Sequence, residues 1–183
     1  MKRGYWMMLV VMIVMVTFYS GCCKKQGESK KLPMPQCLEA DELVEFEDDG
    51  QRFQLHPDAF IAWEKMRDAA KEQGAELDMV SAFRSIARQL EIVEKKRKRG
   101  LSDEDIFKVS ARPGYSEHHT GKAIDLSTPG FLVLEEEFEN SEAFKWLIGN
   151  ANKFGFYLSY PRDNKYGIIY EPWHWCFKGV SPS

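Results

Sequence analysis

Two short motifs, separated by a long stretch of chain, place the strongest constraint on how this protein can fold. The first is Ser116-Glu117-His118-His119-Thr120-Gly121-Lys122-Ala123-Ile124-Asp125, and the second is Tyr170-Glu171-Pro172-Trp173-His174-Trp175-Cys176-Phe177. Together they hold three of the four histidines, and each holds at least one carboxylate as well. Three nitrogen or oxygen ligands plus one unliganded carboxylate form the donor set of a hydrolytic zinc site, where water takes the fourth position. We therefore expect a fold that lays the two motifs side by side.

The candidate ligands are expected on loops and strands rather than on a helix. The chain contains no His-Glu-x-x-His, so a helix-based zinc site of that type is excluded. Gly121 lets the backbone turn between His118 and Asp125, and Pro172 argues against a helix interior just before His174. The alternative, that these histidines are unrelated surface or core residues, has to explain why they gather in two motifs that also carry carboxylates.

The motif residues carry a specific family resemblance. Ser116-x-His118-x-x-Gly121-x-Ala123-x-Asp125 followed by Glu171-x-x-His174 resembles the D-alanyl-D-alanine carboxypeptidases of the VanY type. These are zinc peptidases related to the vancomycin-resistance dipeptidases and to the N-domain of the hedgehog fold. The resemblance spans residues 80–178 and includes three further segments: Ser81-Ala82-Phe83-Arg84-Ser85, Arg112-Pro113-Gly114-Tyr115 and Trp146-Leu147-x-x-Asn150-Ala151-x-x-Phe154-Gly155-Phe156.

The resemblance implies a role for each residue of the site. It places Zn²⁺ on His118, Asp125 and His174, and it makes Glu171 the general base. The position of Glu171, three residues before a ligand, independently suits proton transfer from the attacking water to the leaving amine. Arg84 resembles a family arginine beside the metal. There it would hold a carbonyl oxyanion or a terminal carboxylate, unless it forms a structural salt bridge.

Other motif residues leave more than one interpretation open. Ser116 and Gln89 are candidates for hydrogen bonding to substrate, and each could equally brace its own loop. His119 lies out of register with the motif, so we interpret it as a surface neighbour or an indirect support of the site. Cys176 stands where related sequences often carry an arginine, which weakens the family as a guide to substrate preference.

The chain predicts an α+β fold with a mostly antiparallel central sheet and flanking helices. Turn residues Asp48-Asp49-Gly50 predict a hairpin, and helical periodicity follows from Pro57 to Gly74. Helices and hairpins do not alternate as regular βαβ units. The remaining expected elements are strands 77–83, 123–126, 156–160 and 167–177, and helices 86–99 (capped by Ser85), a short one after Ser102, and 141–154.

The charge of the chain argues against nucleic acid as a partner, and one basic segment allows two interpretations. The formal net charge of −3 gives no overall basic field, so we expect no nucleic acid to bind. The run Lys95-Lys96-Arg97-Lys98-Arg99 could contact anionic wall polymers or a lipid surface. We prefer the simpler interpretation of a solvated last helical turn, which the helix dipole favours.

The N-terminal residues predict export. Lys2 and Arg3 precede an uncharged apolar stretch that ends in Ser20-Gly21-Cys22-Cys23. We expect a signal peptide with a lipobox over residues 1–22, lipidation of Cys22, a tether over 23–36 and the zinc domain over 37–183. Tyr19 departs from the usual aliphatic residue of a lipobox, so an uncleaved anchor and simple secretion stay open. In all three cases the domain is exported, and the leading case is a membrane-anchored lipoprotein facing the periplasm or cell wall.

Export and the family resemblance together indicate the substrate. We expect a monomer that removes the terminal D-alanine from peptidoglycan stem peptides. An L,D-carboxypeptidase, an L-Ala–D-Glu endopeptidase and a non-catalytic wall-binding module of the same fold are alternatives. Because an exported protein can oxidise its thiols, Cys37 and Cys176 could form a disulfide or remain two buried thiols.

Overall fold

The computed structural model describes residues 33–180. The predicted signal peptide, Cys22 and most of the tether therefore lie outside the described residues. Among the helices that are described, none combines the length and the apolar character that crossing a membrane would require.

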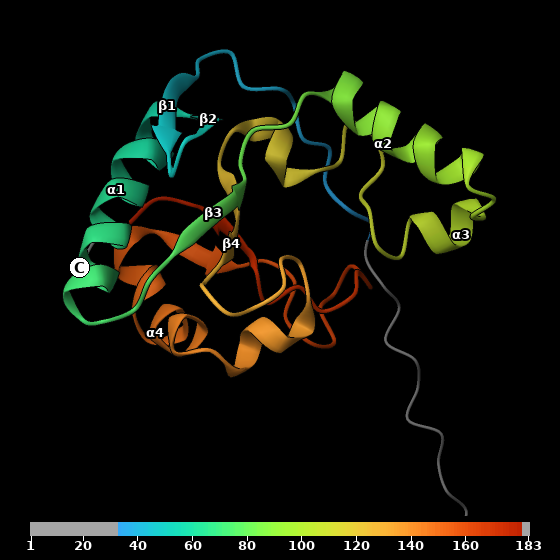
Figure 1. The fold of residues 1–183 in the computed structure, drawn as a ribbon. Helices are drawn as coiled ribbons and strands as arrows, with labels where there is room; N and C mark the ends of the chain where they lie inside the picture. Colours follow the sequence, from blue (N-terminus) through green and yellow to red (C-terminus); the bar gives the residue numbers. More distant parts are fainter. Residues whose placement is uncertain (1–32, 181–183) are drawn as a thin grey trace, which may run out of the picture. The chain divides into compact units, whose positions relative to one another are not determined.

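A four-stranded antiparallel sheet forms the centre of the described fold (Figure 1). Its strands run in the order β3 (Asp78–Ser81), β4 (Ala123–Ser127), β6 (His174–Phe177) and β5 (Phe156–Leu158). A separate antiparallel hairpin joins β1 (Val44–Asp48) to β2 (Gln51–Leu55) through the predicted Asp48-Asp49-Gly50 turn. The prediction of an α+β fold around an antiparallel sheet is confirmed.

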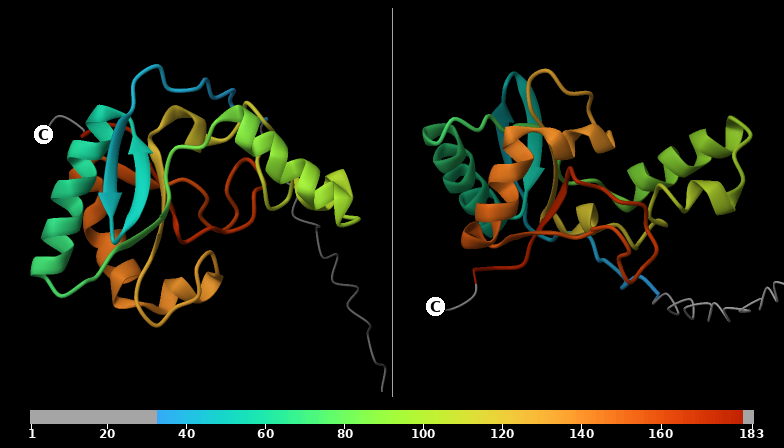
Figure 2. Two further views of the ribbon diagram at one scale, coloured as in Figure 1. Left: turned by 45° about the horizontal axis from the view of Figure 1, so that its top comes forward. Right: turned by 90° about the horizontal axis from the view of Figure 1, so that it is seen from below.

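The helices begin where local capping residues predict. The α-helices are α1 (Pro57–Glu72), α2 (Ile86–Lys98), α3 (Asp103–Ile106) and α4 (Glu142–Asn150). Ser85 Oγ accepts a hydrogen bond from the Arg88 N–H at the start of α2, and Ser102 Oγ does the same for Asp105 in α3. Both views of Figure 2 place α2 and α3 apart from α1 and α4.

The core fills the space between the sheet and helices α1 and α4. Strand β4 is buried along its whole length, and its Ile124 and Leu126 side chains belong to the core. Each large side chain removed from water contributes about 1.5–3 kcal/mol to folding. The fully buried apolar side chains of this core include Leu55, Trp63, Met66, Ile124, Leu126, Phe138, Leu147 and Phe156.

Three predicted elements differ from the structure. The strand expected over 167–177 is a strand only over His174–Phe177, because Pro172 has no N–H for a ladder and the Asn164 side chain bonds the Ile168 carbonyl in a turn. The helix expected over 141–154 is α-helical to Asn150 and continues as the 3₁₀ helix η3 (Ala151–Phe154). The motif expected as a loop contains the 3₁₀ helix η1 (Glu117–Thr120), and a further one, η2, spans Glu136–Asn140.

Gly121 ends η1 in a conformation and a space that only glycine fits. Its φ is +64°, and an added Cβ would lie 2.8 Å from Leu43 Cδ2 and 2.9 Å from the His56 backbone nitrogen. That backbone nitrogen donates a hydrogen bond to the Gly121 carbonyl at 2.9 Å, so it cannot move away freely. Gly121 thus fixes how the first motif turns into β4.

We expect Gly121→Ala to lower the free energy of unfolding by about 2–4 kcal/mol, from left-handed strain plus overpacking. Gly114→Ala is the matched control, since Gly114 has φ +84° with nothing within 4 Å of an added Cβ. Urea unfolding followed by circular dichroism measures both variants. Equal losses in the two variants would mean that the close approach to Leu43 and His56 has no energetic weight.

Candidate active site

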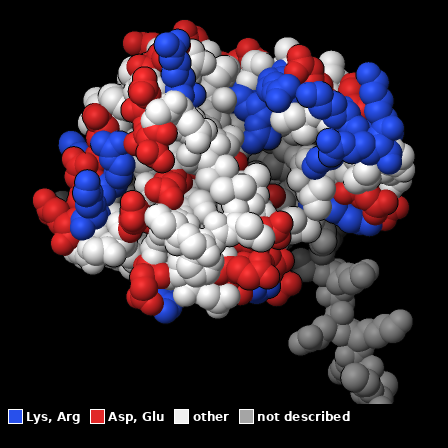
Figure 3. Space-filling model, viewed as in Figure 1, with Lys and Arg blue, Asp and Glu red and all other residues white. Residues whose placement is uncertain are grey.

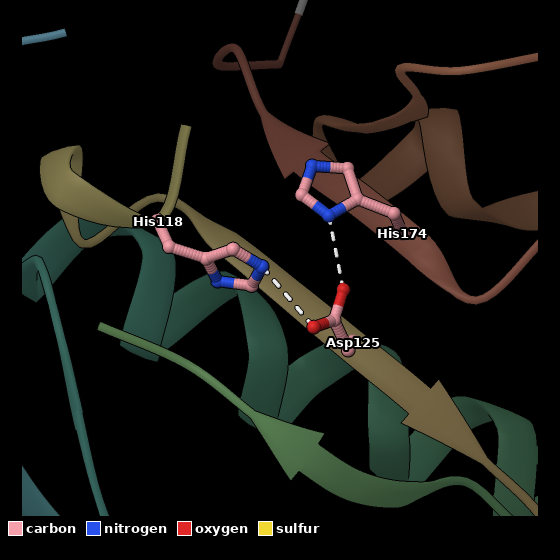
Figure 4. A group of neighbouring side chains, drawn as sticks. All are labelled: His118, Asp125 and His174. Carbon is pink, nitrogen blue, oxygen red and sulfur yellow. Dashed lines mark hydrogen bonds and ion pairs between the residues drawn. The ribbon is translucent and has the colours of Figure 1, made fainter. Parts of the chain in front are cut away.

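The register of two neighbouring strands brings the two motifs together. Asp125 of β4 lies directly opposite His174 of β6, and η1 supplies His118 just before β4. One ligand atom from each of these three side chains lies within 4.8 Å of the others, and all three residues are buried. Figure 4 shows both imidazoles directed at the Asp125 carboxylate.

Hydrogen bonds fix which imidazole nitrogen faces the cluster. His118 Nδ1 lies 2.7 Å from the Ala82 carbonyl, which can only accept, so Nδ1 carries the proton and Nε2 is left 3.1 Å from Asp125 Oδ2. His174 Nε2 lies 3.0 Å from Glu117 Oε2, leaving Nδ1 at 2.9 Å from Asp125 Oδ1. Two imidazole nitrogens, each with its outer partner in place, and one carboxylate fit a divalent metal such as Zn²⁺.

The electrostatics of the cluster favour a cation. Burial would raise the pKa of Asp125, but His118 and His174 outweigh burial and hold that pKa well below its usual range. Burial likewise opposes the shift at Glu117, where the hydrogen bond to His174 prevails and lowers the pKa to about 2. For His174, burial is outweighed by hydrogen bonds to Asp125 and Glu117, which raise its pKa to about 10. Two ionised carboxylates therefore converge on one buried histidine.

Glu171 stands at the edge of the cluster without a strong partner. Its Oε2 lies 4.0 Å from His174 Nδ1, and its side chain is 15% exposed. The backbone holds it in place, because the Glu171 N–H donates to the Tyr160 carbonyl and the His174 N–H donates to the Glu171 carbonyl. Burial raises the pKa of Glu171 to about 7, with His174 opposing the shift. A carboxyl group with this pKa can both take up and release a proton near neutral pH.

Arg84 lies beside the carboxylate of the cluster and lines the same cleft. Its Nη2 is 3.8 Å from Asp125 Oδ2, and its Nη1 donates to Gln89 Oε1 at 2.9 Å. The Arg84 backbone N–H also donates to the His118 carbonyl at 3.1 Å. The guanidinium is thus held in one direction while part of it still faces the cleft.

The three residues left open by the sequence occupy different positions. Ser116 is buried and lines the cleft. Gln89 lies behind Arg84, fully buried, and its amide also donates to the Ala111 carbonyl at 2.7 Å. His119 is buried rather than at the surface, and it bonds the Arg84 carbonyl through Nδ1 and the Gly114 N–H through Nε2. His119 therefore supports the loop that carries Arg84.

The cluster opens into a cleft of about 680 Å³. One wall comes from α2 and the loop that follows α3, and the opposite wall from residues before and within the second motif. Figure 3 shows a hollow at this position beside the basic surface of α2. The lining includes Arg84, Arg88, Ile92, Lys96, Ser110, Ser116, His118, Asp125, Leu134, Tyr160, Ile168, Ile169, Glu171, Trp173 and His174.

Sequence reasoning missed two residues that contact His174. Glu117 bonds its Nε2, and the Tyr160 ring packs against the imidazole with centroids 4.8 Å apart. Glu117 could have been suspected, because it is a carboxylate inside the motif next to a candidate ligand. Tyr160 gives no such signal, since it comes from outside both motifs.

The two cysteines of the described domain are free thiols. Cys37 and Cys176 are both buried, and neither forms a disulfide. Cys176 lies next to the cluster in β6 yet is not part of the group of side chains that could hold a metal.

Comparison with known proteins identifies relatives in sequence. The family model described as VanY, D-alanyl-D-alanine carboxypeptidase, matches residues 52–180. YodJ of Bacillus subtilis (strain 168) is 38% identical over 163 residues, and a D-alanyl-D-alanine carboxypeptidase of Enterococcus faecalis (strain ATCC 700802 / V583) is 27% identical over 174 residues. The alignments cover 82% and 86% of this chain but 58% and 62% of the two relatives. The chain therefore spans about three fifths of their length.

Solved structures resemble the fold as well. The LD-carboxypeptidase LdcB superposes with a TM-score of 0.70 at 34% identity, covering 84% of this chain and 75% of LdcB. A mutant of the vancomycin-resistance D,D-pentapeptidase VanY, solved in complex with Zn(II), superposes with a TM-score of 0.62 at 27% identity. That alignment covers 81% of this chain and 84% of VanY.

Proposed function

This chain belongs to the VanY family of D-alanyl-D-alanine carboxypeptidases, and we propose that it is a zinc-dependent carboxypeptidase that removes terminal D-alanine from peptidoglycan stem peptides. The observation that carries the proposal is the convergence of His118, Asp125 and His174 with Glu171 at one cleft. Three candidate ligands and one weakly paired carboxyl group form the minimum machinery of a zinc hydrolase.

In this proposal His118 Nε2, Asp125 and His174 Nδ1 hold Zn²⁺. When bound, Zn²⁺ supplies a Lewis acid that polarises the scissile carbonyl and lowers the pKa of water to about 7. The solved Zn(II) complex of a relative at 27% identity supports the choice of metal.

The protein's own side chains move the proton and hold the substrate. Glu171 accepts the proton of the attacking water and returns it to the leaving amine, a task suited to its pKa of about 7. Arg84 donates hydrogen bonds to the developing oxyanion or to the terminal carboxylate. Ser116 donates from the cleft wall, and Gln89 acts through Arg84 by fixing the direction of the guanidinium.

A second activity has support from one specific observation. The LD-carboxypeptidase LdcB superposes with the higher TM-score of the two structures, 0.70, and shares 34% identity. Removal of D-alanine from a tetrapeptide, across an L,D bond, is therefore the leading alternative. The two activities share the metal, the base and the cleft, and differ in the residue accepted on the acyl side of the bond.

Mass spectrometry of defined muropeptides incubated with the zinc-loaded protein tests the proposal. Loss of one alanine from a pentapeptide supports D,D-carboxypeptidase activity, and loss of one alanine from a tetrapeptide supports the L,D alternative. Internal cleavage between L-Ala and D-Glu would exclude both carboxypeptidase activities and identify the protein as an endopeptidase. Muropeptide binding without any cleavage would favour a non-catalytic wall-binding module.

We also propose that the protein is exported, anchored through lipid on Cys22, and monomeric. The charged start, apolar stretch and Ser20-Gly21-Cys22 sequence support export, although these residues lie outside the described part of the chain. Inhibiting lipoprotein signal processing should leave a larger precursor in the membrane fraction. A mature size unchanged by the inhibitor would remove the lipid anchor from the proposal.

Glu117 is expected to set the metal affinity through His174. Glu117→Ala should weaken Zn²⁺ binding about 10–100-fold, because outer partners fix the tautomer and basicity of a ligating histidine. Glu117→Gln keeps an acceptor for the Nε2 proton and should lose less. Competition with a chromophoric chelator measures the affinity, with the exposed Glu137→Ala as the control. Unchanged affinity in Glu117→Ala would contradict this support role.

A further inference from the structure

Helix α2 presents one half-buried lysine to the cleft. Arg88, Ile92 and Lys96 recur at a spacing of four residues and all line the cavity, so they form one stripe along the helix. The last turn of α2 is basic throughout, but Lys96 is the residue of that turn that lines the cleft. The interpretation of this run as a uniformly solvated turn therefore fails at Lys96.

Lys96 differs from the two arginines of α2 in its partners. Arg88 pairs with Glu91 at 2.6 Å, and Arg97 pairs with Glu94 at 2.6 Å and Asp103 at 2.7 Å. Within the described residues Lys96 forms no ion pair, and its Nζ donates to Ser110 Oγ at 2.6 Å. An ammonium has three donors, so the contact with Ser110 fixes its direction and leaves donors for a ligand.

Lys96 lies close enough to Arg84 and Glu171 to feel their charges, but it is not one of the residues of the proposed reaction centre. Burial lowers the pKa of Lys96, Arg84 lowers it further, and Glu171 raises it, so the ammonium lies within the electrostatic field of both site residues. Along the axis of α2, Lys96 lies about 15 Å from the first residue of the helix, and Arg84 precedes that residue. The Arg84 guanidinium is directed at Asp125 and Gln89, whereas the Lys96 ammonium is directed at Ser110, so the two cations offer separate contacts to a peptide in the cleft.

We propose that Lys96, oriented by Ser110, binds a second carboxylate of the substrate, on a residue to the N-terminal side of the scissile bond. This inference rests on the proposed function, and it narrows the substrate to an acidic peptide. Two groups of a stem peptide have the required chemistry. They are the α-carboxylate of a γ-linked glutamyl residue and the side-chain carboxylate of a diamino-diacid at the following position.

Paired peptides that differ only by amidation test the proposal. Wild-type protein should cleave the carboxylate peptide with a higher kcat/KM than its amide. Lys96→Met should lower kcat/KM for the carboxylate peptide about tenfold to a hundredfold, through KM, and leave the amide unchanged, because it removes a charge-assisted hydrogen bond. Amidating the glutamyl and the diamino-diacid carboxylates separately identifies which one is bound.

Control variants distinguish recognition of the substrate carboxylate by Lys96 from a purely structural contact between Lys96 and Ser110. Lys96→Arg should retain the preference for the carboxylate peptide, and Lys95→Met, at an exposed position outside the cleft, should behave as wild type. If Lys96→Met slows both peptides equally, Lys96 only braces α2 against Ser110 and the proposal is overturned.

Failure of the proposed function gives a different result from failure of this inference. If wild-type protein cleaves no peptide, the proposed function fails before any variant is compared. Calorimetric binding of the same peptides then tests Lys96 directly. Tighter binding of the carboxylate peptide that disappears in Lys96→Met supports the subsite, and equal binding of carboxylate and amide by wild type overturns it.

Discussion

Glu171→Ala should abolish peptide hydrolysis while leaving the metal bound. General acid–base catalysis contributes about 10²–10⁴-fold to a rate, and Glu171 is positioned to serve as base and then as acid in one cycle. Its side chain is not one of the three that could hold the metal, so metal content should stay at the wild-type level. Turnover of a D-alanyl-D-alanine peptide, with metal analysis of the same sample, measures both quantities.

Two comparison variants make the Glu171 result specific. Glu171→Gln keeps the size of the side chain and removes the titratable proton, so it should be as inactive as Glu171→Ala. Glu64→Ala removes an exposed carboxylate on α1 and should keep full activity. Retained turnover in Glu171→Gln would show that a group other than Glu171 transfers the proton.

Asp125→Ala should remove the metal itself. Loss of outer partners of a metal site costs about 10–100-fold in affinity, and loss of a direct ligand should cost more. Asp125 is also the side chain that both His118 Nε2 and His174 Nδ1 contact, so no other carboxylate of the cluster can replace it in that position. Metal analysis after dialysis should find zinc in the wild type and almost none in Asp125→Ala.

A thermal measurement checks the same variant independently. A ligand at 100 times its Kd stabilises a protein by about 2.7 kcal/mol, so zinc should raise the Tm of wild type. Asp125→Ala should show no such rise, while the exposed Asp41→Ala should respond as wild type does. A fully zinc-loaded Asp125→Ala protein would exclude Asp125 as a ligand.

The sequence predicted best what local chemistry determines. Ser85 and Ser102 mark helix starts, because a cap depends on residues only three positions away. The strand expected over 167–177 is wrong over residues 167–173, because its apolar pattern does not reveal that Asn164 closes a turn there. Periodicity alone cannot weigh such a side-chain contact against a strand.

The same distinction, between what neighbouring residues determine and what distant contacts determine, applies to the candidate site. His118, Asp125 and His174 were found as a group because two motifs supply them, and the structure brings them within contact. Gln89 gave no sign that both ends of its amide are engaged, by Arg84 and by the Ala111 carbonyl. Side-chain partners that come from distant segments depend on the finished packing, which the order of residues does not state.

The register of β4 against β6 gives the metal site a consequence for folding. A slip of one residue in that pairing would turn His174 to the opposite face of the sheet, away from Asp125. A metal ion held by both strands would therefore bind only the correct pairing and would slow the opening of these two strands. Amide hydrogen exchange in β4 and β6 should be slower with zinc than after chelation, and exchange in the separate β1–β2 hairpin should not change. Zinc binding would then select molecules with the correct pairing of β4 and β6 before the enzyme binds its first substrate.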